Sequence, residues 1–361
     1  MSEIKDIAYK FGSGRYFQGE NMLEQVGPEC KKVSKKVYVV GGPTAISLTK
    51  KRLVDGFESV NLPYHFAEYS GYCSYASAHK AIEEMKKEGC DAIVGVGGGR
   101  IMDFAKLIAD IATLPVFTVP TSIATCAGYT TLSVLYDDTG KTVGNYYIEK
   151  EVEGVFVDSD IMVHQPVRLV ASGIMDALAK YIEIKNGHKE VESDSFNVDL
   201  LTASVLARHT YDTLLENREQ AFKDIENHVY SKAVETVVFL SLPVTGMISG
   251  ISKGFGQSAL GHELYYQLRT HYTQEALSFL HGEVVAIGLI MQLNYNETPE
   301  QVPFLQELMK SMDMPIKLTD IGVPNTSEAY ELLGNNLIAS PFVTDDEFKK
   351  KLLWESLKII F

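Results

Sequence analysis

Residues 91–106, DAIVGVGGGRIMDFAK, contain the transition that decides the fold. The apolar run at 92–96 is typical of a buried parallel strand, and the three glycines at 97–99 separate it from an amphipathic helix that starts near Arg100. A strand that turns through glycines into a helix presents bare backbone N–H groups and the positive end of the helix dipole, which together favour a phosphate. Glycine also removes the side chains that would keep a pyrophosphate at a distance. The segment therefore predicts a phosphate site rather than a tight turn without a ligand.

This phosphate site differs in design from the usual dinucleotide fingerprint. Counted from Gly95 or Gly97, the pattern G-x-G-x-x-G would need a glycine at Arg100 or Met102. The next strand, at 115–119, also runs into proline, threonine and serine instead of closing on an acidic residue.

Asp103 and Lys106 lie three residues apart on the new helix and share one face. Either they belong to the phosphate site or they form an ordinary exposed ion pair, and their spacing alone leaves both interpretations open.

Strands and helices alternate over the first 160 residues. We expect strands at 36–40, 64–69, 92–96, 115–119 and 154–157, and helices at 43–54, 75–88 and from about 100. This alternation predicts a parallel sheet covered by helices on both faces. Residues 131–136 and 141–147 flank the turn sequence Asp137-Asp138-Thr139-Gly140 and predict a β-hairpin.

The sequence predicts mainly helices in the remainder of the chain. Pro166 suits the first position of a helix, and further helices are expected at 198–217, 225–241, 261–269 and 284–295. The predicted fold class is thus an α/β dinucleotide-binding domain with a parallel sheet over 1–162, followed by an all-α helical bundle domain over 163–361. A ligand is expected in the cleft between them, at the carboxyl ends of the strands.

Composition limits the class of function. The chain has 361 residues, 45% of them hydrophobic, and a net charge of −14, which excludes the electrostatic footprint of a nucleic-acid binder. We recognise no signal peptide at the start and no stretch approaching the roughly 20 apolar residues of a membrane span. The four cysteines form no CxxC pair, so a reduced cytoplasmic protein without membrane partners is expected.

Three residues of the helical half are candidate metal ligands. Asp176 lies among apolar neighbours, while His262 and His281 each sit beside a glycine and a glutamate. Buried carboxylates and imidazoles must be paired or coordinated, and one carboxylate with two imidazoles can hold Zn²⁺ and leave a position open for substrate. Spacings this long carry no local motif, however, and each histidine taken alone is more often structural. The other seven histidines are treated as background: His65, His79, His164, His188, His209, His228 and His271.

Several blocks, in order along nearly the whole chain, resemble the glycerol dehydrogenase branch of the iron-containing alcohol dehydrogenase superfamily. They are GRYFQG at 14–19 (the opening strand), GGGRIMDFAK at 97–106, PTSIATCAGYTTLSVLY at 120–136, VFVDSDIMVHQPVRLVASGIMDALAKYIE at 155–183, SALGHELYYQL at 258–268 and FLHGEVVAIG at 279–288. The resemblance implies a dehydroquinate synthase-like fold and a metal-dependent, NAD(P)-linked oxidoreductase. Its expected reaction interconverts a small polyol and its hydroxyketone, glycerol and dihydroxyacetone above all, and the family forms homo-oligomers.

The resemblance also assigns site residues. Asp176, His262 and His281 would hold the metal, and the cofactor would contact Gly98, Gly99, Arg100, Asp103, Thr121, Thr130, Leu132 and Tyr136. Iron-type members carry a further histidine one helical turn after the aspartate, where this chain has Lys180. Zinc is therefore expected in preference to iron.

Two positions depart from the family pattern. Glycerol dehydrogenases have an aspartate that contacts substrate where this chain has Cys126, so the polyol could differ from glycerol. At Gly42, NAD-preferring relatives often carry an acid that repels a 2′-phosphate, so NADP could be accepted beside NAD.

The Gly-Pro-Thr that follows Gly41 also resembles sn-glycerol-1-phosphate dehydrogenases, and that activity is the alternative; Lys253 is one candidate cation for such a substrate. More distant alternatives are a dehydroquinate synthase-like lyase, which would carry a glutamate at Asp176, and a non-catalytic nucleotide binder.

Overall fold

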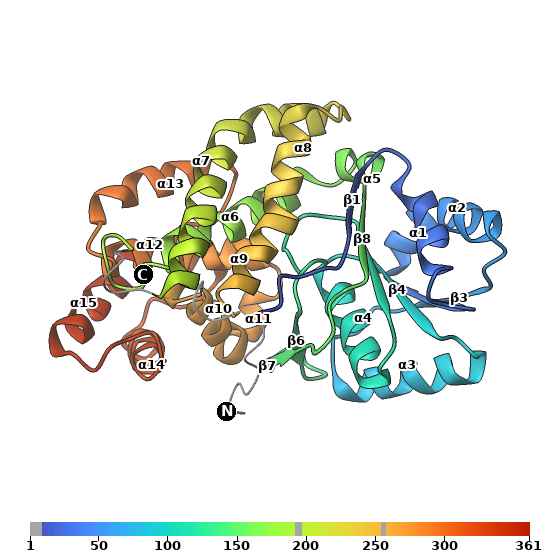
Figure 1. Ribbon diagram of the computed structural model, residues 1–361. Coiled ribbons are helices and arrows are strands. Elements are labelled where there is room, and N and C mark those ends of the chain that lie inside the picture. Colours follow the sequence, from blue (N-terminus) through green and yellow to red (C-terminus); the bar gives the residue numbers. More distant parts are fainter. Residues whose placement is uncertain (1–8, 192–196, 254–257) are drawn as a thin grey trace.

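The computed structural model describes residues 9–191, 197–253 and 258–361. The prediction that the chain starts without a signal peptide rests partly on residues 1–8, which lie outside the described part of the chain. Figure 1 shows the sheet with its helices at one end of the molecule and the remaining helices at the other.

Six parallel strands form the main sheet, in the order β1-β8-β5-β4-β2-β3. Central strands are buried along their whole length, because a parallel sheet covered on both faces requires continuous apolar runs. The strands are β1 (Tyr16–Gly19), β2 (Val37–Gly41), β3 (Tyr64–Glu68), β4 (Ala92–Gly97), β5 (Val116–Pro120) and β8 (Gly154–Asp158). Every strand predicted for this sheet is present within one or two residues of its expected bounds.

Helices cover both faces of the sheet (Figure 1). They are α1 (Met22–Cys30) with α2 (Pro43–Ser59), and α3 (Tyr75–Glu88) with α4 (Gly99–Ala112). A separate antiparallel hairpin, β6 (Leu132–Tyr136) and β7 (Thr142–Tyr147), packs β6 against α4. Its turn is closed by the Asp137 carboxylate, which accepts hydrogen bonds from Thr139 and Lys141, so the predicted hairpin and turn are confirmed.

Helices make up the rest of the described chain. They are α5 (Ser159–Val163), α6 (Val167–Glu183), α7 (Val198–Glu226), α8 (Lys232–Phe239), the π-helical turn η1 (Leu240–Val244), α9 (Thr245–Ile251), α10 (Leu260–His271), α11 (Thr273–Ala276), α12 (His281–Tyr295), η2 (Pro299–Gln301), α13 (Val302–Ser311), η3 (Leu318–Ile321), α14 (Ser327–Ile338), α15 (Glu347–Leu357) and η4 (Lys358–Ile360). Apart from His281 and Asn294, every residue of α12 is buried, and the helix packs against both α6 and α10. The predicted fold class is confirmed, whereas the domain boundary after residue 162 stays a prediction.

The helix predicted at 225–241 is present from Lys232, but its predicted start was wrong. α7 continues to Glu226, and the chain then turns through His228, whose φ of 56° is left-handed. A new helix begins after Ser231, whose hydroxyl caps it by accepting a hydrogen bond from the Val234 N–H. The apolar periodicity continued across this turn and concealed it. Pro166 also precedes α6 by one residue instead of opening it.

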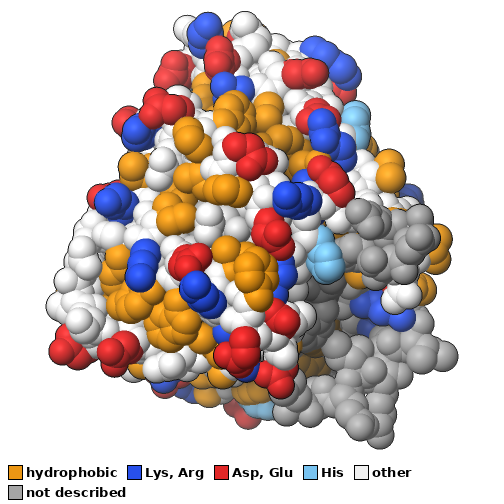
Figure 2. Space-filling model, turned by 90° about the vertical axis from the view of Figure 1, so that its left-hand side faces the viewer, with side chains coloured by type: hydrophobic (Ala, Val, Ile, Leu, Met, Phe, Trp, Pro, Cys, Tyr) orange, Lys and Arg blue, Asp and Glu red, His pale blue; other side chains and the backbone are white. Residues whose placement is uncertain are grey.

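The expectation that no segment reaches membrane-spanning length also needs correction. The 20 residues Lys232–Ile251 are long and apolar enough by composition, but 67% of the apolar window is buried inside the protein. They behave as a core helix of the bundle. Figure 2 shows the end of the helical half that faces away from the sheet. Apolar and charged side chains intermingle over this surface, as is usual for a solvated face.

A candidate metal and cofactor site between the sheet and the helices

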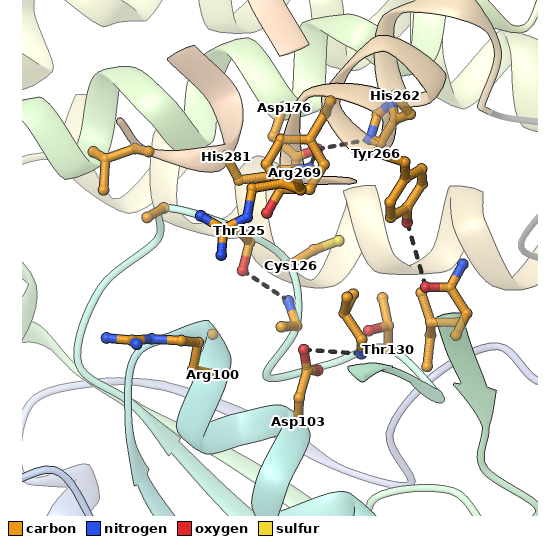
Figure 3. Close-up of a pocket in the computed structure, with 18 of the residues that line it drawn as sticks. Arg100, Asp103, Thr125, Cys126, Thr130, Asp176, His262, Tyr266, Arg269 and His281 are labelled. Atoms are coloured by element: carbon orange, nitrogen blue, oxygen red, sulfur yellow. Dashed lines mark hydrogen bonds and ion pairs between the residues drawn. The ribbon is translucent and has the colours of Figure 1, made fainter. Parts of the chain in front are cut away.

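A cavity of about 720 Å³ lies between the two halves of the molecule. It is lined by the start of α4, the loop after β5, the hairpin, and residues of α6, α10 and α12 (Figure 3). Because β4 and β5 both end at this cavity, it occupies the place where parallel α/β sheets bind their ligands.

The glycine turn forms the sheet side of the cavity. Gly97 has a φ of 153°, which excludes ordinary side chains, and Gly98 caps α4. A Cβ atom at Gly99 would lie 2.9 Å from the Thr125 hydroxyl, so the loop approaches the helix start too closely for a larger residue. The first N–H groups of a helix have no partners within the helix, and here they begin at the cavity wall.

Asp103 and Lys106 are buried, so the exposed ion-pair interpretation was wrong. Lys106 is fully buried; its Nζ donates hydrogen bonds to the carbonyl oxygens of Thr130 and Leu132 and lies 3.2 Å from Asp103 Oδ1. The second carboxylate oxygen of Asp103 accepts from the Val134 N–H at 3.2 Å. This network fixes the hairpin to α4, and with it the cavity residues Thr130, Leu132 and Tyr136.

Asp176, His262 and His281 converge at the helical side of the cavity, although they come from three different helices (Figure 3). Asp176 Oδ1 lies 3.4 Å from His262 Nε2 and 3.6 Å from His281 Nε2, and the three atoms all lie within 4.8 Å of one another. With metal–ligand bonds of about 2.0 Å, neighbouring ligands of a tetrahedral ion lie about 3.3 Å apart. The donor set and two of its three separations therefore fit a zinc-like ion.

Close helix contacts make this convergence possible. A Cβ atom at Gly282, next to His281, would lie 1.9 Å from the Ser172 carbonyl oxygen on α6. A Cβ atom at Gly173 would lie 1.8 Å from the Ile123 carbonyl oxygen of the loop after β5. Glycine at both positions brings α12 and the loop against the helix that carries Asp176.

Glu183 fixes the orientation of His262. This carboxylate is fully buried on α6, two turns after Asp176, and it accepts hydrogen bonds from the His262 Nδ1–H and, at 2.9 Å, from the His262 backbone N–H. With Nδ1 protonated, Nε2 presents its lone pair to the centre of the cluster. Burial alone would lower the pKa of His262, but the Glu183 carboxylate outweighs it and raises the pKa.

Lys180 supplies a positive charge to the same cluster. Its Nζ lies 3.2 Å from Asp176 Oδ1 and 3.1 Å from His262 Nε2, and the residue is only 3% exposed. Burial would raise the pKa of Asp176, but the Lys180 ammonium holds it well below its usual range. The carboxylate is therefore ionised and available to bind a cation.

His281 is held by the start of its own helix. The Glu283 side chain accepts from the Leu280 backbone N–H at 2.8 Å and forms two hydrogen bonds with Arg168 at 2.6 and 2.7 Å. The Tyr265 ring packs edge-on against the imidazole, with 4.4 Å between ring centroids. Burial lowers the pKa of His281, which favours the neutral imidazole that metals bind.

Cys126 lies in the cavity wall on the loop after β5, facing the gap between the metal cluster and the hairpin (Figure 3). Burial raises the pKa of its thiol to about 12, so it stays neutral at physiological pH. It therefore contributes no negative charge at the position where an aspartate is expected in glycerol dehydrogenases.

Twelve of the residues singled out from the sequence line this one cavity: Gly98, Gly99, Arg100, Asp103, Thr121, Cys126, Thr130, Leu132, Tyr136, Asp176, His262 and His281. Gly42 is not among the lining residues; it caps the start of α2 and directly follows Gly41, which pairs with Val96 in β4. Sequence reasoning missed Glu183, Tyr265 and Arg269. An acid two turns after Asp176 on the same helix face was the available signal for Glu183.

Known proteins resemble this chain over most of its length. Residues 13–152 match the family model described as iron-containing alcohol dehydrogenase. An uncharacterised oxidoreductase of Synechocystis is 30% identical over 277 residues, which cover 76% of this chain and 69% of that protein. This chain belongs to the iron-containing alcohol dehydrogenase family. The predicted enzyme class, an alcohol dehydrogenase, is thereby confirmed.

Within this family, the resemblance to glycerol dehydrogenases that the sequence predicts is also confirmed. The glycerol dehydrogenase of Citrobacter freundii is 28% identical over 313 residues, covering 86% of this chain and 84% of the relative. The crystal structure of glycerol dehydrogenase from Schizosaccharomyces pombe superposes with a TM-score of 0.80 at 25% identity, covering 99% of this chain and 90% of that one.

Proposed function

We propose that this family member is a zinc-dependent, NAD(P)-linked polyol dehydrogenase that interconverts glycerol, or a closely related vicinal diol, and the corresponding hydroxyketone. One observation carries the proposal: the cluster of Asp176, His262 and His281 shares a single cavity with the glycine turn of α4. A hydride donor and a metal-held substrate must lie side by side, and this cavity is large enough for both. The relatives named glycerol dehydrogenase support the choice of substrate.

In this proposal the sheet side of the cavity binds the cofactor and the helical side binds the metal. Gly98, Gly99 and the start of α4 would receive the cofactor pyrophosphate, with Arg100 beside it. Thr121, Thr130, Leu132 and Tyr136 would line the path of the nicotinamide half toward the metal cluster. Residues 1–162 would thus form the cofactor domain, and residues 163–361 the metal domain.

Asp176, His262 and His281 would hold the metal, whose contribution when bound is to polarise the substrate oxygen. The protein's own contribution is positioning. Glu183 keeps the His262 Nε2 lone pair directed into the cluster, and Glu283 with Arg168 fixes the helix start that carries His281. Tyr265 shields the imidazole of His281 from solvent on one side. The reaction itself belongs to the cofactor, which accepts or donates the hydride.

Zinc is proposed in preference to iron because Lys180, which does not ligate as an ammonium, stands one turn after Asp176. The family model's name refers to iron, so metal analysis decides between the two. We further propose that NADP is accepted beside NAD, since Gly42 places no acid at the end of β2. A cytoplasmic homo-oligomer is the proposed state; the four cysteines are all buried and free, as in a reducing compartment.

Arg269 favours a second candidate substrate class, one with an anionic group. It lines the cavity, is 7% exposed, stacks over the Tyr136 ring, and its Nε has no hydrogen-bond partner among the described residues. The charge of this guanidinium would favour a substrate with a phosphate or carboxylate beside the reacting hydroxyl, as in sn-glycerol-1-phosphate. Lys253, the cation considered for this purpose from the sequence, does not line the cavity.

A substrate screen tests both candidates. Zinc-replete protein is assayed with NAD and NADP against glycerol, vicinal diols, hydroxyketones and glycerol phosphates. We expect turnover of an uncharged diol and about one zinc per chain, the stoichiometry of a single three-ligand site. Preference for a glycerol phosphate, lost in Arg269→Gln but not in Lys253→Gln, would select the second candidate. Cofactor binding with no turnover of any alcohol would contradict both.

A further inference from the structure

Lys180 occupies an unusual position for a residue beside a metal cluster. Its Nζ lies within hydrogen-bonding distance of two of the three candidate ligand atoms, Asp176 Oδ1 at 3.2 Å and His262 Nε2 at 3.1 Å. The Nδ1–H of His262 donates a hydrogen bond to Glu183. Because an ammonium can only donate, Nε2 accepts the hydrogen bond from Lys180 with its lone pair.

The same lone pair would have to bind the metal. Asp176 Oδ1 and His262 Nε2 are 3.4 Å apart. With bonds of about 2.0 Å to both atoms, an ion would lie no more than about 4 Å from the present position of Nζ. An imidazole nitrogen cannot accept a hydrogen bond and coordinate a metal with one lone pair. The ammonium would also be repelled strongly by a divalent ion at this distance.

The ammonium nevertheless stabilises the cluster before any metal arrives. Asp176 is 3% exposed and ionised, and a buried carboxylate without a counter-charge is costly. Lys180 provides that charge from the next turn of the same helix, and it holds the side chains of Asp176 and His262 at the separation that a metal requires. Because Lys180 also lines the cavity, its side chain has room to leave the cluster.

We propose that Lys180 is an internal competitor of the metal: it assembles the ligand set in the metal-free protein and lowers the affinity of the site for a divalent ion. This inference rests on the metal site of the proposed function. It predicts two effects of opposite sign when the charge is removed, a less stable metal-free protein and a tighter metal complex.

Lys180→Met tests the proposal, because methionine keeps most of the side-chain length and removes the charge. The protein is stripped with a chelator, and its zinc dissociation constant is measured by competition with a chromogenic zinc indicator. We expect the dissociation constant to fall at least tenfold in the variant. The melting temperature of the stripped variant should be lower than that of the stripped wild type, and zinc should raise it by a larger increment.

Lys185→Met is the matched control. Lys185 is also buried, lies two residues beyond the end of α6, and pairs with the Glu190 carboxylate at 3.5 Å. Loss of this buried lysine should leave the zinc dissociation constant unchanged. If Lys180→Met does not fold, Lys180→Gln repeats the measurement with a polar side chain of similar length.

The outcomes separate the two proposals. A zinc dissociation constant that is unchanged in both Lys180 variants overturns the competitor role, and one that rises makes Lys180 a ligand or support of the metal. In either case the metal site itself stands. If wild-type protein binds no divalent ion in this titration, the metal site of the proposed function fails, and the competitor role fails with it.

Discussion

The carboxylate of Glu183 accepts two hydrogen bonds from one residue, His262, through its Nδ1–H and its backbone N–H. The acid lies on α6 and the histidine on α10, so this contact joins two of the three helices that form the metal cluster. The orientation of the imidazole therefore depends on a group that would never touch the metal.

Glu183→Gln should weaken zinc binding by about 10- to 100-fold, the usual effect of removing the partner of a metal-binding histidine. The two hydrogen bonds from His262 go to different carboxylate oxygens, and glutamine would replace one of these oxygens with an NH2 group that cannot accept. Zinc affinity of the stripped protein is the measurement. Asp158→Asn is the control, since Asp158 is equally buried but pairs with Arg52 far from the cavity. It should lower the melting temperature and leave zinc affinity unchanged; equal zinc affinity in both variants would contradict the role of Glu183.

Replacement of a candidate ligand should abolish the metal and the activity together. Asp176→Asn and His281→Ala are expected to lose the bound zinc and to lower kcat/KM by at least about a thousandfold, because metal polarisation of an oxygen is worth several kcal/mol. His271→Ala serves as the control, since His271 ends α10 outside the cavity lining. Elemental analysis and initial rates are measured on the same samples. Full activity in metal-stripped wild-type protein would refute the assignment.

The sheet and its glycine turn could be predicted from sequence because their signals are local. The apolar run of β4, the glycines after it and the capped turn of the hairpin each determine their own backbone conformation. The helix break at His228 was missed because the apolar pattern continues through it, and the left-handed residue that ends α7 is not a glycine. The burial of Lys106 could not be predicted either, because its partners are the carbonyl groups of Thr130 and Leu132, more than 20 residues further along the chain.

The candidate metal ligands could be predicted only from the family resemblance, and the reason is physical. Asp176, His262 and His281 meet only because α6, α10 and α12 pack closely, and nothing in the sequence around each residue indicates that packing. The same limit applies to Glu183 and Lys180. Their spacing from Asp176 along the helix can be read from the sequence, but their contacts with His262 can be predicted only if the position of α10 is known. Long-range packing, rather than side-chain chemistry, was the missing information.

Cys126→Asp should raise kcat/KM for glycerol about tenfold or more, if this position touches substrate. A carboxylate can accept a charge-assisted hydrogen bond from a substrate hydroxyl, worth about 1.5–3 kcal/mol, whereas a thiol that is neutral below a pKa of about 12 is a poor acceptor. Cys126→Ser controls for side-chain size without adding charge. Initial rates over a panel of polyols are compared among the three proteins. Identical substrate profiles would show that residue 126 does not face the polyol.

Gly42→Asp should shift cofactor preference toward NAD. Gly42 directly follows Gly41, which pairs with Val96 just before the glycine turn. A carboxylate at position 42 would repel the 2′-phosphate of NADP while accepting hydrogen bonds from the ribose of NAD. We expect the ratio of kcat/KM values, NADP over NAD, to fall at least about tenfold, since two like charges at 4 Å near a protein surface repel by about 4 kcal/mol before screening. Gly42→Ala is the control, because a Cβ atom at this position meets nothing within 4 Å and the φ of −67° suits any residue. The alanine variant should keep both the wild-type melting temperature and the wild-type ratio, and an unchanged ratio in the aspartate variant would place the ribose away from the end of β2.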